Sequence, residues 1–379
     1  MPGKLLSSRS QTFVAGMVGA LFVWLPTSAQ EISPDKAKFL GAAGCASAMC
    51  HGGAGEQRGQ HAIWSKLDFH TRAHATLTTA RSQRFADTLK LGNPADAARC
   101  TVCHHPFQSV PAEKKAATVG PFEGISCESC HGAAEAWVRS HTRTDISHAD
   151  RVNAGMRDLK NLHVRAGTCV ACHQNLDPEI RAAGHPELIF ELDGQSIAEP
   201  KHWRETNAWS GPQAWLVGQS VALREMSWQL EREPSAKRTE TERQQALLWL
   251  LQKVSSQTAP EGAAQTWADQ LARDVAAKIG SASAARAQLA ALVATQSDFK
   301  NAAIAQPLQA RRAERLVLGL DRLLAAFKLG KKSAPSVKLD QLFKDVQSLP
   351  DFDPARFAAH LGEFEQALKE LPEGKPAQP

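Results

Sequence analysis

Cysteine and histidine residues of this chain follow one another at a spacing that carries a specific chemistry. Two residues separate Cys127 from Cys130, and His131 follows at once. In this pattern the two thiols add to the vinyl groups of a haem and the neighbouring imidazole binds the iron, as in c-type haem attachment. The same spacing recurs at Cys100, Cys103 and His104 and at Cys169, Cys172 and His173.

A longer form of the motif lies nearer the start of the chain, where four residues separate Cys45 from Cys50 and His51 follows. The four motifs together use all eight cysteines. Zinc knuckles or disulfides are alternatives that the cysteine spacing alone permits, but neither explains a histidine after every second cysteine. A Cys45–Cys50 disulfide stays open as the alternative for this motif, whose extra residues must bulge away from the porphyrin. We predict four covalently attached haem c groups.

The second axial position of each iron decides what the haem can do. Histidine there gives a closed, low-potential centre, methionine raises the potential, and an empty position can bind substrate. Methionine is scarce after the leader, whereas nine histidines besides the four in the motifs precede residue 210. They are His61, His70, His74, His105, His141, His148, His163, His185 and His202. This supply suffices for histidine on every iron.

Residues 1–29 have the features of a secretory signal peptide. Lys4 and Arg9 precede an apolar run over residues 13–25, and small residues lead to a cleavage site after Ala29. An uncleaved membrane anchor is the alternative, but the run is short for a span. No later segment looks able to cross a bilayer. We therefore predict an exported, periplasmic protein without a membrane span after cleavage, which suits covalent haem.

The net charge of +5 does not indicate a nucleic-acid partner. Without Lys4 and Arg9 of the leader, 42 of the 44 basic residues remain against 39 acidic ones. Haem propionates and ferric irons would leave the loaded protein close to neutral. Local charged patches near a haem could still steer a redox partner.

The chain divides into two parts of different character. All eight cysteines precede residue 173, which predicts a tetrahaem cytochrome c domain over residues 30–210 and a helical domain over residues 211–379. In the first we expect short, loop-rich structure around the haems, with a helical pattern over residues 62–91, a short helix near His141, irregular chain over 142–164 and an extended stretch over 187–193. The fold class is therefore mainly α.

From Gln213 onward, apolar residues recur at helical spacing between Pro and Gly breaks. This pattern predicts six or seven helices in an antiparallel bundle or a repeat-like stack. Two roles remain open for this part, a docking platform for a partner and a packing unit that shields the haem-binding part.

Several segments before residue 220 resemble the tetrahaem cytochromes of the cytochrome c-554 family, which accept electrons in nitrogen oxidation. The similar features are the order of the motifs, Trp64…His70-x-x-Ala73…Leu77, Cys127-Glu128-Ser129-Cys130-His131-Gly132, and His141 ten residues beyond His131. Larger bacterial multihaem cytochromes contain segments similar to Gly184-His185-Pro186…Phe190-Glu191 and to residues 200–203. The resemblance covers residues 40 to 220.

The family resemblance implies that His141 serves the first haem, His70 the fourth and a downstream histidine the third, with the second haem five-coordinate. This chain differs because it has two downstream histidines, His185 and His202, where the family needs one. We predict that both are distal ligands, so that every iron is closed. The predicted iron ligands are then His51, His104, His131, His173, His70, His141, His185 and His202.

These features predict an electron carrier between periplasmic or membrane-associated redox proteins, with no catalytic residues. The alternative is a multihaem reductase or oxidoreductase of a small nitrogen or sulfur compound that uses one five-coordinate haem. The two differ in one observable, carbon monoxide binding at an open ferrous iron. The sequence leaves the donor, the acceptor, the potentials and the oligomeric state open.

Overall fold

The computed structural model describes residues 33–204, 210–232, 238–278 and 280–369. It is mainly helical, and over these ranges it contains no strand, which confirms the fold class. An isolated parallel bridge between Phe39 and Lys115 is the closest approach to a sheet. The signal-peptide prediction lies outside the described residues. Within those residues, every helix is too short or too polar to cross a bilayer.

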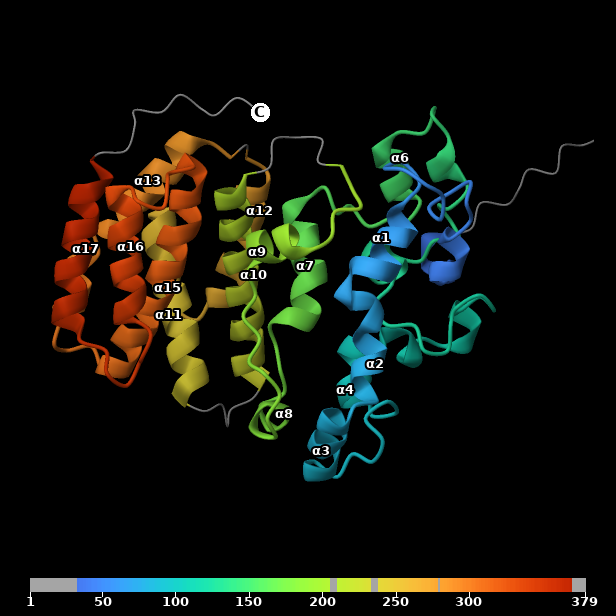
Figure 1. Ribbon diagram of the computed structural model, residues 1–379, viewed down its shortest axis with the longest axis horizontal. Helices are drawn as coiled ribbons and strands as arrows, with labels where there is room; N and C mark the ends of the chain where they lie inside the picture. Colours follow the sequence, from blue (N-terminus) through green and yellow to red (C-terminus); the bar gives the residue numbers. More distant parts are fainter. Residues whose placement is uncertain (1–32, 205–209, 233–237, 279, 370–379) are drawn as a thin grey trace, which may run out of the picture.

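The haem-binding half, residues 33–204, consists of short helices joined by loops (Figure 1, blue to green). The helices are α1 (Gln60–Leu67), α2 (Ala73–Leu77), α3 (Ala80–Thr88), α4 (Ala98–His104), α5 (Cys127–His131), α6 (His148–Asn153), α7 (Leu162–His173), α8 (Pro178–Ala182) and α9 (Leu192–Ala198). Short 3₁₀ turns η1 (Pro34–Lys36), η2 (Ala42–Cys45), η3 (Phe69–Arg72), η4 (Pro106–Ser109), η5 (Ala112–Lys114) and η6 (Ser140–Thr142) lie between them.

The helical pattern expected over residues 62–91 is divided into α1, η3, α2 and α3. The backbone leaves the helix at Asp68, whose ψ is 126° and whose side chain accepts a hydrogen bond from the His70 amide. A second break precedes α3, where the Thr79 hydroxyl accepts from the Ser82 amide as an N-cap. Capping side chains therefore interrupt a pattern that apolar spacing alone reads as continuous.

The structure differs in part from three other local predictions made from the sequence. Irregular structure was expected over residues 142–164, but α6 forms there because Ser147 and Asp150 make a capping box. The extended stretch expected over 187–193 ends at Glu191, and α9 begins at Leu192. The short helix expected near His141 is the 3₁₀ turn η6.

The helical half is a stack of longer helices (Figure 1, yellow to red). They are α10 (Gly211–Arg232), α11 (Arg238–Ser255), α12 (Ala264–Ala276), α13 (Ala282–Val293), α14 (Gln296–Phe299), α15 (Gln306–Leu324), the 3₁₀ turn η7 (Ala325–Phe327), α16 (Ala334–Asp345) and α17 (Pro354–Leu368). Trp215 of α10 is 1% exposed and packs on Gly319 of α15, where an added Cβ would lie 2.9 Å from the indole. Close helix packing of this kind holds the bundle together.

The hydrophobic core of the helical half extends into the haem-binding half. Ala166 and Val170 of α7, and Phe190 and Leu192 around the start of α9, are at most 2% exposed and belong to the same buried cluster as α10 to α17. In Figure 1, α7 lies between the bundle and the α1, α2 and α4 column. The domain boundary near residue 210 stays a prediction, and α7 and the start of α9 contribute side chains to the core of the helical half.

Candidate haem-binding site

Three of the four motifs end a helix. Helices α4, α5 and α7 each finish on the motif histidine, at His104, His131 and His173. One helical turn then brings the two thiols to one face, with the imidazole directly after them. The first motif differs, because η2 ends at Cys45 and the chain turns before His51. None of the eight cysteines, all of which lie in the described residues, forms a disulfide.

Each of three motif histidines faces one predicted distal histidine. The ring centres lie 6.0 Å apart for His51 and His141. The other two distances are 6.5 Å for His104 and His185 and 6.0 Å for His70 and His173. A metal–imidazole bond is about 2.0 Å long, so two imidazoles on opposite sides of one metal have ring centres about 6 Å apart. The spacing therefore fits axial ligands of one iron.

The remaining motif histidine, His131, lies near the remaining predicted ligand, His202. Burial, followed by electrostatic repulsion from the neighbouring His202, lowers the pKa of His131 to about 4. Burial also lowers the pKa of His104 and His173. A low pKa keeps the imidazole neutral, which is the form that binds a metal.

The Nδ1 atoms of seven of these eight histidines contact hydrogen-bonding groups, which leaves Nε2 for the iron. Nδ1 lies within hydrogen-bond distance of a backbone carbonyl in four of them, of a glutamine side-chain amide in two and of carboxylates in one. The partners are Ala73 O for His104, Val138 O for His141, Pro186 O for His185, Pro200 O for His202, Gln60 for His51, Gln195 for His173, and Asp68 with Glu199 for His70.

The carboxylates on His70 distinguish the fourth pair. Asp68 Oδ1 lies 3.0 Å and Glu199 Oε2 lies 3.3 Å from His70 Nδ1. Hydrogen bonds with Asp68 and then Glu199 raise the pKa of His70 to about 10, and a metal on Nε2 would replace the second ring proton. Two carboxylates therefore hold the Nδ1 proton strongly, which raises the basicity of Nε2 as a ligand.

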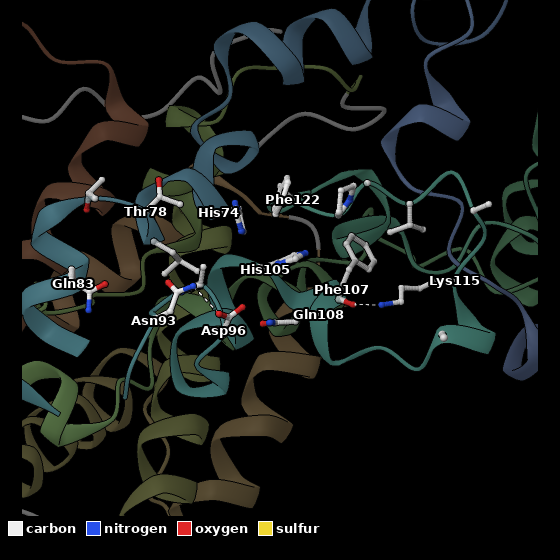
Figure 2. Close-up of a pocket in the computed structure, with 18 of the residues that line it drawn as sticks. His74, Thr78, Gln83, Asn93, Asp96, His105, Phe107, Gln108, Lys115 and Phe122 are labelled. Atoms are coloured by element: carbon white, nitrogen blue, oxygen red, sulfur yellow. Dashed lines mark hydrogen bonds between the residues drawn. The ribbon is translucent and has the colours of Figure 1, made fainter. Parts of the chain in front are cut away.

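Other histidines are engaged in ways that do not suit an iron ligand. Nε2 of His148 contacts Asp158 at 2.9 Å, and Nε2 of His163 contacts Asp269 at 2.8 Å. His74 and His105 are closer than the three opposed pairs, with ring centres 4.9 Å apart. They line a cavity of about 1100 Å³ with Phe122 (Figure 2). None of these four was predicted as a ligand.

The motif thiols lie beside one another in a defined order. Cys45 of the first motif is next to Cys127 of the third, and Cys103 of the second is next to Cys172 of the fourth. Cys130 and Cys169 bring the third and fourth motifs together, and each thiol has a pKa raised first by burial. The motifs therefore follow the spatial order first, third, fourth, second.

Glu128, inside the third motif, fixes the chain that precedes the first motif. Its carboxylate is 1% exposed and accepts from the backbone amides of Leu40, Gly41 and Ala134 at 2.6 to 2.9 Å. Burial raises its pKa in spite of these bonds. Sequence reasoning noted Glu128 only within the family pattern. From the sequence, an acidic residue between two cysteines does not reveal which backbone amides its carboxylate will bind.

These residues fit haem c. Paired thiols precede each motif histidine, the imidazoles are spaced for a shared metal, and their second nitrogens have partners. Each bound haem would supply an iron that alternates between ferric and ferrous states and so holds one electron. The protein's contribution is to orient the ligands and limit water around them.

Comparison with known families agrees with this chemistry, that of a c-type cytochrome. The family model described as cytochrome c554 and c-prime matches residues 45–132, which contain the first three motifs. The match confirms the resemblance over that segment and indicates a c-type cytochrome that carries electrons on covalent haem. No curated protein matches the chain. No solved structure matches it either.

Proposed function

We propose that this protein is a periplasmic tetrahaem cytochrome c that carries electrons between redox partners through four bis-histidine haems. The observation that carries the proposal is the set of opposed histidines. Ring-centre distances of 6.0, 6.0 and 6.5 Å suit three irons, and His131 with His202 supply the fourth. Closed irons favour electron transfer over substrate binding.

The order of the motifs supports a continuous path. Neighbouring thiols link the first motif to the third, the third to the fourth and the fourth to the second. Electrons that enter beside either terminal motif would then pass between adjacent centres without leaving the protein. The helical half packs on α7, which ends in the fourth motif, so we infer a shielding and positioning role for it.

Two measurements on the matured protein test the proposal. The intact mass should show four haems and no free thiol, because the four motifs use all eight cysteines. Three haems with a Cys45–Cys50 disulfide would contradict the stoichiometry. The ferrous protein should give no carbon monoxide difference spectrum. Binding at one haem per chain would contradict the closed model and favour the reductase alternative, with the second haem at His104 as the open centre.

Distal-ligand variants sharpen the test. His185→Ala and His202→Ala should each open one iron, raise the potential of that centre and create carbon monoxide binding that the parent lacks. His148→Ala is the matched control, because its Nε2 already contacts Asp158. His61→Ala is a second control. Carbon monoxide binding in either control, or none in both distal variants, would refute the ligand assignment.

A further inference from the structure

One short helix contacts both histidines of the fourth pair. Gln195 of α9 lies 3.2 Å from Nδ1 of His173, and Glu199, which caps the end of α9, lies 3.3 Å from Nδ1 of His70. The two imidazoles face each other at 6.0 Å with their planes at 90°. A single rigid element therefore contacts the proximal and the distal side of the same site.

The Gln195 amide nitrogen faces Nδ1 of His173, and an iron on His173 would require the amide to turn. With the iron on Nε2, Nδ1 of His173 carries a proton and needs an acceptor. The amide oxygen of Gln195 is buried and otherwise has no hydrogen-bond partner. Since the two ends of an amide are assigned from their partners, turning the amide lets its oxygen accept a hydrogen bond from Nδ1–H of His173.

The other end of α9 is anchored in the helical half. Leu192 is fully buried against Gly218 of α10, where an added Cβ would lie 2.8 Å from the leucine Cβ. Gln219 of α10 donates to the Phe190 carbonyl at 3.0 Å. The close approach and the buried hydrogen bond fix the start of α9 to α10.

A charged clamp adds to this anchor. Arg322 of α15 contacts the Glu191 carboxylate at 2.8 Å and the Asp193 carboxylate at 3.1 Å. Asp193 is 2% exposed, so this ion pair is largely shielded from solvent. An arginine of the helical half therefore holds the N-terminal turn of the helix that contacts both axial histidines.

We infer that the helical half sets the reduction potential of the fourth haem through α9, with Gln195 and Glu199 as positioning residues for His173 and His70. The inference rests on the proposed tetrahaem function. Among the described Nδ1 partners, only those of His70 are carboxylates. Negative charge there favours the ferric iron, so these carboxylates lower the potential of the fourth haem.

The experiment uses the full-length protein with all haems attached and follows each centre by potentiometric titration and electron paramagnetic resonance. Glu199→Gln keeps the shape of the side chain and removes its charge. It should raise the potential of one centre alone, and a tenfold change in that equilibrium corresponds to about 59 mV. Gln195→Leu should change the ferric resonance of the same centre, because that signal depends on the angle between the imidazole planes. The control Glu179→Gln removes a carboxylate that pairs with Arg99.

Arg322→Gln tests transmission from the helical half, because this residue contacts α9 and none of the histidines. It should shift the same centre in potential. Arg311→Gln is the matched control on α15, since Arg311 pairs with Glu314 of its own helix. If Arg322→Gln leaves the reduction potentials of all four centres unchanged, or shifts them all equally, the inference is wrong.

Two outcomes separate this inference from the proposed function. Fewer than four haems, or carbon monoxide binding by the parent, would refute the function itself. Four closed haems with no shift in Glu199→Gln would refute only the role of α9. Asp68, His70 and Glu199 place ligand atoms within 4.8 Å of one another. A stoichiometric metal other than iron that disappears in Glu199→Gln would therefore also overturn the inference, because Nδ1 would then serve a cation.

Discussion

The two halves of this chain bury apolar surface in different ways. In residues 33–160 the large buried apolar side chains are few and separate, namely Leu77, Phe107 and Trp137. In the helical half, Leu, Phe, Val and Ala side chains from α10 to α17 form one contiguous cluster. A helical bundle of this size stabilises itself by side-chain packing, whereas the haem-binding half depends on another source of apolar surface.

Exposed apolar side chains follow the same division. Met49, Phe69, Val102 and Phe122 are all at least 60% exposed and all lie in the haem-binding half. Val102 lies between the two cysteines of the second motif. The proposed haems would cover such side chains, whereas the helical half covers its apolar side chains with its own core.

The largest expected effect is that the haem-binding half loses its folded structure when no haem is attached. Protein produced without haem attachment should keep the helical half folded and lose protection over residues 33–160. Because Ala166, Val170, Phe190 and Leu192 belong to the bundle core, the protected fragment should begin near α7 and retain α9. Limited proteolysis with mass spectrometry maps the fragment ends.

The control is the fully matured protein, which should resist cleavage in both halves. A protected haem-free fragment that begins near residue 210 would show that α7 and α9 unfold together with residues 33–160. Loss of protection over the whole chain would show that the halves fold as one cooperative unit.

A smaller effect is expected from a single core side chain of the helical half. Trp215→Ala removes an indole that is 1% exposed and should cost about 3–5 kcal/mol of the free energy of unfolding. Trp228 on the same helix is 39% exposed and stacks on Arg232, so Trp228→Ala should cost far less. Thermal unfolding followed by circular dichroism at 222 nm measures both. Equal losses would mean that α10 does not pack as described.

The haem motifs and the candidate iron ligands could be predicted from the sequence. The contacts that join the two halves could not. Cysteine spacing alone places the motifs, and helices α4, α5 and α7 end on the motif histidines as one-turn geometry requires. The four predicted distal histidines lie near the four motif histidines, and their ligation stays a prediction. The histidines were identifiable because so few side-chain types bind haem iron.

The missed features depend on contacts between distant segments. Gln195, Glu199 and Asp68 are ordinary polar residues in the sequence, and only the fold brings them to His173 and His70. The sequence 187–193 reads as extended, so α9 was not expected. Its helix forms because Phe190 and Leu192 are buried against α10, which is a tertiary effect that local propensity does not report.

The smallest expected effect is a pH dependence of the free energy of unfolding caused by Asp193, which lies where the two halves meet. Burial raises the pKa of Asp193 to about 6, against an ordinary value of 3.8, although Arg322 opposes the rise. The folded protein therefore holds this proton more tightly than the unfolded chain. The associated stability is fully present below pH 3.8, and it is lost as the pH rises toward 6. A shift of about two units corresponds to at most about 3 kcal/mol.

Asp193→Asn removes this titration, because the amide stays neutral in both states. Chemical unfolding between pH 4 and 7 should show the parent losing stability relative to the variant over the range from 4 to 6. Asp274→Asn, on the exposed face of α12, should follow the parent. If the parent and Asp193→Asn keep a constant difference across this range, Asp193 titrates normally. The start of α9 would then be more open to water than its 2% exposure indicates.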